Sequence, residues 1–236
     1  FLRGLKKSPV RTTGSPGFVG NRILAAYRAA ADSLLARGAS PYAVDAAMTE
    51  YGFKMGPYAA LDFSGLDVSA AFRARFAEQR MDRAFPIARC LMDEGRLGQK
   101  SGRGFYIYED SENPRAGRAD QAVLDLIATL RAELGFAPRS VDASEIVETC
   151  LLAMLNEGAR LLEEGVAMRP SDINVVMLSG FGFPRHKGGP MKAGEMRGLL
   201  KCLGRLEALS QEARFWRHAA RLRAAVKNGN RFATED

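Results

Sequence analysis

The sequence is poor in residues that hold metals or form disulfides. It contains only three Cys and two His in 236 residues. The cysteines lie at Cys90, Cys150 and Cys202, and none belongs to a CxxC pair or to a Cys/His spacing typical of zinc sites. We therefore expect no metal site and no disulfide framework, and we expect reduced, buried thiols as in a cytosolic-type compartment.

Long apolar runs are also missing. Mean hydropathy is -0.17, and no run approaches the ~20 residues that a membrane helix needs. Hydrophobic residues make up 47% of the chain, which is enough for globular cores, so we expect a water-soluble protein without a membrane span. The chain begins at Phe1 without an initiator Met or the apolar core of a signal peptide, so we expect a fragment of a longer protein.

Acidic residues are outnumbered by basic ones, 27 against 34, for a net charge of +7. Such a charge favours anionic partners in general. However, the basic residues are interspersed with acids, and aromatic and basic residues do not recur together as they do in surfaces that stack bases. Nucleic acid is therefore not an expected partner.

Helical spacing dominates the first half of the chain. Ser15 can cap a helix whose first residue is Pro16, and its apolar stripe continues to Gly38, which predicts a helix of about 22 residues. Ser40 and Pro41 open a second helix. Further helical segments are predicted at 58–66, 70–79 and 86–91, followed by an extended segment at 102–108 and a linker at 109–118.

The second half repeats this pattern. A capping-box-like start at 142–145 opens a helix that ends at Gly165. At a shift of 127 positions, residues 31–38 align with 158–165, and Asp45 aligns with Asp172. The Gly56-Pro57 pair meets a second Gly-Pro pair at 189–190 after a short insertion. We therefore predict two copies of one helical unit.

Several motifs in order carry a family resemblance. The first copy contains SPGFVGNR at 15–22, MGP at 55–57, LD at 61–62, GLD at 65–67 and GQKSGRGFY at 98–106. The second contains NEG at 156–158, RPSDI at 169–173 and GFGFPRHKGGP at 180–190. This set resembles the C-terminal portion of the L-3-hydroxyacyl-CoA dehydrogenases, in the duplicated form of the multifunctional fatty-acid oxidation enzymes.

The resemblance implies an all-α fold of two tandem, similar helical domains preceded by a remnant of a Rossmann domain. We expect the Rossmann remnant at 1–14, the first helical domain at 15–110, a linker helix at 111–141 and the duplicated domain at 142–236. The second copy carries Glu148 near the position where the first carries Asn21. This implies that the duplicate packs in place of a partner subunit and is not a second active site.

The implied function is NAD-dependent oxidation of L-3-hydroxyacyl-CoA to 3-ketoacyl-CoA in fatty-acid β-oxidation, by the full-length enzyme. NAD would be bound by the missing N-terminal domain, because no GxGxxG occurs in this sequence and the family's catalytic His and Glu belong to that domain. The fragment alone is expected to be inactive. Two alternatives remain: a non-catalytic helical interaction module, and the C-terminal domain of another NAD-dependent hydroxyacid dehydrogenase.

By resemblance, Asn21 matches the family's catalytic asparagine, beside the oxygen whose charge changes in the reaction. Its position lies roughly 140° from the apolar stripe of its helix, so it should face away from the core. Ser15 and Lys100 are candidate substrate-binding residues, although Ser15 also fits a helix cap and Lys100 a solvated turn. The expected ligand is an acyl-CoA.

The resemblance also implies partners and a location. The Rossmann domain is expected in cis, with room for an enoyl-CoA hydratase module upstream and for a thiolase or a second copy as partner. The expected location is cytoplasmic, as in bacteria, with a peroxisomal location as the alternative.

Overall fold

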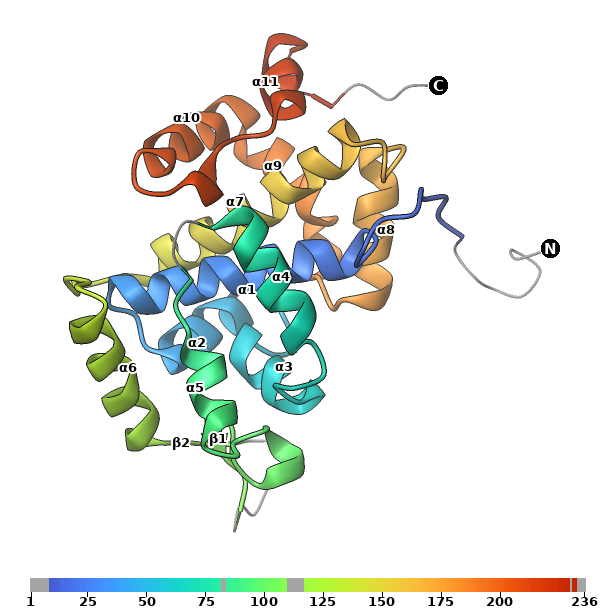
Figure 1. The fold of residues 1–236 in the computed structure, drawn as a ribbon. Coiled ribbons are helices and arrows are strands. Elements are labelled where there is room, and N and C mark those ends of the chain that lie inside the picture. The colour runs from blue at the N-terminus through green and yellow to red at the C-terminus, as the bar shows by residue number, and fades with distance from the viewer. Residues whose placement is uncertain (1–8, 82–83, 110–116, 230, 233–236) are drawn as a thin grey trace. The chain divides into compact units, whose positions relative to one another are not determined.

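The computed structural model describes residues 9–81, 84–109, 117–229 and 231–232 (Figure 1). Within these ranges the all-α prediction is confirmed, because the only sheet has two short antiparallel strands. The elements are α1 (Gly20–Arg37), α2 (Pro41–Tyr51), α3 (Pro57–Ser64), α4 (Ala70–Arg80), α5 (Ile87–Asp93), η1 (Gln99–Ser101), β1 (Tyr106–Ile107), β2 (Arg118–Ala119), α6 (Gln121–Glu133), α7 (Ala143–Glu163), α8 (Pro170–Gly180), η2 (Arg185–Lys187), α9 (Pro190–Arg197), α10 (Leu199–Ser210), η3 (Arg214–Trp216) and α11 (Ala220–Lys227).

The chain forms two compact units. Unit 1 combines the residues up to Tyr27 with those from Cys150 onward, and unit 2 comprises residues 28–149. Each boundary falls inside a long helix, so α1 and α7 each supply one end to each unit. The domain boundaries expected from the sequence repeat, 15–110, 111–141 and 142–236, stay a prediction.

In unit 2, α2 packs against α3 and α5 packs against α6 (Figure 1). The rings of Tyr58 and Phe105 meet in its core, with centroids 4.6 Å apart. Arg131 of α6 donates hydrogen bonds to the carbonyls of Leu35 and Ala39, at 2.7 Å each. A cation thus donates to carbonyls at and just beyond the C-terminal end of α1, where positive charge is favoured.

In unit 1, α9 packs against both α8 and α10, and α10 packs against α11 (Figure 1). Trp216 is the largest fully buried side chain. Asn156 of α7 accepts a hydrogen bond from Ala219 N at 2.9 Å and donates one to the Arg217 carbonyl at 3.0 Å, which ties the segment before α11 to α7.

The expected Rossmann remnant at 1–14 falls largely on residues 1–8, which lie outside the described residues. The described part of this segment joins unit 1. Thr12 forms an antiparallel bridge with Ala167, and Thr13 N donates to the Val166 carbonyl at 3.2 Å. The first residues that the structure describes are therefore held by the loop that follows α7.

The repeat is clearest in how two short helices are capped. Asp45, on α2, accepts hydrogen bonds from Tyr58 N (2.9 Å) and Ala59 N (2.7 Å) in the first turn of α3. Such amides have no partner within their own helix, so a carboxylate from elsewhere stabilises the helix start. Gly56 is required for this approach, because a Cβ there would lie 2.3 Å from Asp45 Cα.

The same device recurs in unit 1, but the sequence alignment assigned it to the wrong residue. Asn174 Oδ1 accepts hydrogen bonds from Met191 N (3.0 Å) and Lys192 N (3.5 Å) at the start of α9. Asp172, which the shift of 127 placed over Asp45, instead pairs with Arg169. The reason is an insertion of two residues: residues 39–40 separate Gly38 from Pro41, whereas residues 166–169 separate Gly165 from Pro170, which displaces the alignment.

A second pair of carboxylates, one in each unit, also accepts hydrogen bonds from backbone N–H groups. Asp62 of α3 accepts hydrogen bonds from Phe105 N and Tyr106 N at 2.9 Å each, and Glu195 of α9 accepts one from Phe232 N at 3.3 Å. In both units, the carboxylate of the short helix therefore holds a later backbone segment. The Gly-Pro loops that the sequence aligned do precede equivalent helices.

The buried cap of α3 predicts an unusual pH dependence. Burial raises the pKa of Asp45 to about 6, so the folded chain binds its proton more tightly than the unfolded chain does. Stability from this group should therefore fall as pH rises from about 4 to about 6. Asp45→Asn, which copies the natural Asn174, should fold and should reduce this fall by on the order of 1 kcal/mol in urea unfolding between about pH 4.5 and about pH 7.

Asp67→Asn is the matched control, because Asp67 is exposed and the hydrogen bond from Lys100 lowers its pKa. Its removal should not reduce the fall in stability. If Asp45→Asn shows the same pH dependence as the unsubstituted chain, the carboxyl of Asp45 does not titrate in this range and the prediction is wrong.

Candidate active site

The chain makes a tight turn before α1 begins. Phe18 N donates a hydrogen bond to the Ser15 carbonyl at 2.9 Å, and Gly17 has φ 78°. Proline followed by left-handed glycine at the two central positions is the pattern of a type II turn. The predicted helix start at Ser15 and Pro16 is therefore wrong: α1 begins at Gly20 and has 18 residues. Ser15 contributes a backbone carbonyl to the turn and does not cap the helix.

Phe18 leaves the turn in a left-handed conformation with φ 46°, the one non-glycine residue with positive φ in the described ranges. This conformation costs about 1–2 kcal/mol for a residue with a Cβ. The residue is 58% exposed, so packing within the chain offsets little of that strain.

The first turn of α1 is anchored within unit 1. Val19 is 1% exposed, and Gly20 lies so close to Phe181 that a Cβ would come within 1.9 Å of its ring. Only glycine fits at this contact without moving the ring. The start of α1 therefore packs directly against Phe181, the residue that follows α8.

Arg22 fixes the next part of the helix through charge. Its Nε donates to Glu157 Oε1 at 2.8 Å, and its Nη2 donates to Glu164 Oε1 at 3.1 Å. The side chains of Arg22 and Glu157 are 7% and 0% exposed. Burial alone would lower the pKa of Arg22, but the hydrogen bonds and attraction of Glu164 and Glu157 outweigh it and raise the pKa above its ordinary value. Arg160 gives Glu157 a second cationic partner at 3.3 Å.

Asn21 lies between these anchors and faces outward. Its backbone N donates to the Gly17 carbonyl at 3.2 Å, while its side chain is exposed and has no hydrogen-bond partner among the described residues. The predicted orientation away from the core is confirmed. An amide on a rigid first turn, with its donor and acceptor both free of the described chain, is available to a ligand, and the helix start favours negative charge there.

The other two predicted site residues have different surroundings. Ser15 lies in unit 1, as Asn21 does, and its side chain has no hydrogen bond within the described part of the chain. Lys100 lies in unit 2, where its Nζ contacts both carboxylate oxygens of Asp67 at 2.6 Å. An anionic ligand at Lys100 would therefore have to compete with the carboxylate of Asp67 for the ammonium group. The role of all three residues in binding or catalysis stays a prediction.

Sequence reasoning missed Phe18 and Glu157 as individual residues of this region. A signal for Glu157 was present, because it lies three residues after Met154 and four before Leu161 on the apolar stripe of α7. A carboxylate on a buried face requires a cation. For Phe18 there was no signal, because its strain arises only once Gly17 forms the turn.

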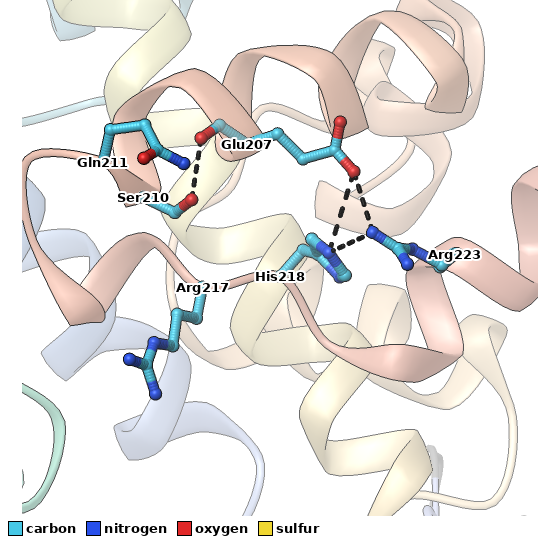
Figure 2. A pocket seen from close by; sticks show the side chains of 6 residues that line it. All are labelled: Glu207, Ser210, Gln211, Arg217, His218 and Arg223. Carbon is cyan, nitrogen blue, oxygen red and sulfur yellow. Dashed lines mark hydrogen bonds and ion pairs between the residues drawn. The ribbon is translucent and has the colours of Figure 1, made fainter.

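Unit 1 also contains an open pocket of about 550 Å³ lined by Glu207, Ser210, Gln211, Arg217, His218 and Arg223. Figure 2 shows Glu207, His218 and Arg223 turned toward one another, with Arg217 pointing away. Arg223 contacts Glu207 Oε1 and His218 Nε2 at 3.0 Å each. Because a guanidinium only donates, Nε2 accepts. These groups satisfy one another, and Asn21 does not line the pocket.

The described residues contain no Rossmann-type βαβ unit. That unit has parallel strands, a glycine-rich turn and a helix, and the only sheet in these ranges is the antiparallel pair of β1 and β2. Within the same ranges, no group of three His, Cys, Asp or Glu side chains is placed to hold a metal ion. No described helix is long and apolar enough to cross a membrane.

The family model for the 3-hydroxyacyl-CoA dehydrogenase C-terminal domain matches twice, at residues 17–108 and 146–232. The chain belongs to this family. The first match includes Phe18, Asn21, Arg22 and Lys100, and the second includes Glu157. The predicted resemblance to the C-terminal portion of a 3-hydroxyacyl-CoA dehydrogenase is thus confirmed.

Longer relatives share this dehydrogenase portion. The peroxisomal bifunctional enzyme of Danio rerio is 40% identical over 85% of this chain, and the fatty acid oxidation complex subunit alpha of Shewanella amazonensis is 34% identical over 98% of it. The matches cover 30% and 32% of those relatives. The chain therefore spans about a third of the length of the curated relatives it matches.

Solved structures share the fold. The dehydrogenase part of multifunctional enzyme 1 from Caenorhabditis elegans has a TM-score of 0.70 and 28% identity, with 94% of this chain and 51% of that one covered. The 3-hydroxybutyryl-CoA dehydrogenase of Escherichia coli has a TM-score of 0.73 at 22% identity, with coverages of 94% and 62%, which shows the fold alone.

The Arg22 network predicts an asymmetric response to substitution. Glu157→Ala should destabilise the chain by about 3 kcal/mol, because a buried guanidinium loses its buried carboxylate. Glu164→Ala is the matched control: it shares the partner Arg22, but its side chain is 40% exposed, so about 1 kcal/mol or less is expected. Urea unfolding measures both, and equal losses would contradict the assignment of Glu157 as the principal partner.

Proposed function

We propose that this chain is the dehydrogenase C-terminal part of a fatty-acid β-oxidation enzyme that oxidises L-3-hydroxyacyl-CoA to 3-ketoacyl-CoA with NAD, and that Asn21 is its catalytic residue. The observation that carries the proposal is the exposed side chain of Asn21, without a partner in the described structure, on an anchored helix start in a chain of this family. The names of the longer relatives support fatty-acid oxidation as the setting.

The chemistry required of Asn21 is modest. The oxygen on C3 of the substrate gains negative character as it loses its proton, and an amide N–H aimed at it stabilises that charge. Val19, Gly20 and Arg22 hold the helix turn that carries Asn21, so the donor needs little reorganisation when substrate binds.

Ser15 and Lys100 are proposed substrate-binding residues. Ser15 precedes Asn21 on the turn, and its hydroxyl is free to hydrogen bond a polar substrate group. Lys100 offers an ammonium group for a phosphate of CoA once Asp67 releases it.

The wider organisation is also a proposal. We infer that 15–110 and 142–236 are duplicated copies joined by 111–141, which the two family matches and the paired caps Asp45 and Asn174 support. NAD and the catalytic His and Glu would come from a Rossmann domain upstream in cis. We further propose an enoyl-CoA hydratase module upstream and a thiolase or a second copy as partner. The names of the relatives, a bifunctional enzyme and a complex subunit, support further modules and partners in general. The proposed location is cytoplasmic, with peroxisomal as the alternative. A bacterial enzyme and a peroxisomal enzyme are both among the relatives that match.

The 236 residues alone should not turn over substrate, because in this proposal the NAD site and the catalytic base belong to another domain. Absorbance at the NADH band, with an L-3-hydroxyacyl-CoA and NAD, measures this. Any turnover above that of a buffer blank would contradict the assignment of the cofactor and the base to another domain.

In the full-length protein, Asn21→Ala should lower turnover by at least about tenfold, because the developing charge loses a fixed donor. Thermal unfolding should be unchanged, since the side chain is exposed and makes no hydrogen bond with the described residues. Asn228→Ala, at an exposed asparagine at the end of α11, is the matched control and should retain full activity. Unchanged activity of Asn21→Ala would favour a non-catalytic interaction module, and turnover of hydroxyacids without CoA would favour another dehydrogenase class.

A further inference from the structure

Phe18 combines two features that a folded chain has little reason to keep together. Its backbone is in the left-handed region, with φ 46°, and the residue is 58% exposed. Glycine adopts this conformation freely and would give up little buried area here. Strain held at an exposed side chain points to a use for that side chain outside the packed core.

The position of Phe18 close to Asn21 indicates what its side chain could contact. The N–H of Phe18 donates the hydrogen bond that closes the turn at Ser15. Two residues later, Gly20 packs against Phe181. The carbonyl of Gly17 accepts the hydrogen bond of Asn21 N at 3.2 Å, so the turn and the first helical turn form one connected piece. An apolar ring and a free amide are therefore presented three residues apart on the same rigid segment.

Other exposed apolar residues of unit 1 differ from Phe18. Met168, Met196 and Leu200 are 49%, 71% and 63% exposed, yet none of them has positive φ. Scattered exposed apolar side chains on ordinary backbone need no special explanation. Phe18 alone among these four combines exposure with strain.

We propose that the ring of Phe18 is a specificity-determining contact for the acyl chain of the substrate, on the side of C3 away from the thioester. The proposal rests on the function proposed for Asn21, because the amide defines where C3 lies. An acyl chain is the apolar part of the proposed substrate, so burying it against the ring removes apolar surface of both from water. Longer chains should gain more from this contact than short ones.

The test uses the full-length dehydrogenase with 3-hydroxybutyryl-CoA and 3-hydroxydecanoyl-CoA. Phe18→Ala and Phe18→Gly should lower kcat/KM for the decanoyl substrate by about tenfold and for the butyryl substrate by less than about twofold. Phe18→Leu should retain most of the preference, because it keeps an apolar surface. The glycine variant should unfold at an unchanged or higher temperature, since it relieves the strained φ.

Met196→Ala is the matched control, an exposed apolar residue of the same unit on unstrained backbone, and it should leave both substrates unaffected. Equal losses for the two substrates, with or without a lower unfolding temperature, would overturn the proposal and would indicate that the ring packs against another part of the full-length protein. No loss with either substrate would also overturn it. The Asn21→Ala result separates the two proposals: a loss there with no chain-length effect at Phe18 rejects only the acyl contact.

Discussion

The start of α1 depends on one buried ion pair. The side chains of Arg22 and Glu157 are almost wholly buried. An unpaired charge is severely unfavourable in such an interior. The geometry of the pair fixes which side of α1 faces inward, and Asn21, one residue earlier, consequently faces outward. Gly20 and Val19 add packing on the same turn, so the exposed amide is carried by a helix end with little freedom to rotate.

The capping contacts show that α3 and α9 are held at their first turns by different side chains. In one copy a carboxylate holds the start of the short helix, and in the other an amide does the same with a single oxygen. Both solutions satisfy backbone N–H groups at a helix start. Only the carboxylate can titrate, so equivalent positions can share a structure and differ in their response to pH.

The parts of the fold predicted well are those fixed by local chemistry. Ser40 accepts a hydrogen bond from Ala43 N as a helix cap, and Asp142 accepts one from Glu145 N, as the capping signals indicated. The start of α1 was misplaced because Pro16 and Gly17 suit a turn as well as a helix start, and tertiary contacts at Gly20 decided between them.

The candidate site was predictable only in part. The motif and the helical angle placed Asn21 on the exposed side. The strain at Phe18 arises only when Gly17 forms the turn, and the partner of Arg22 lies 135 positions away in the sequence. A constant shift also misassigned Asp172, because an insertion of two residues changes which side chain reaches the next helix.

Unit 1 is built from two separate stretches of sequence, with unit 2 between them along the chain. This order limits where the chain can be divided. A segment cut at the edge of the second repeat would keep Glu157 and Glu164 but lose Arg22, as well as the Thr13 contacts to the loop after α7. The boundary of the sequence repeat is therefore not a boundary between compact units, because the stretch that contains Thr13 and Arg22 belongs to the same unit as Glu157. A cut made there would leave the buried carboxylate of Glu157 without its principal cation.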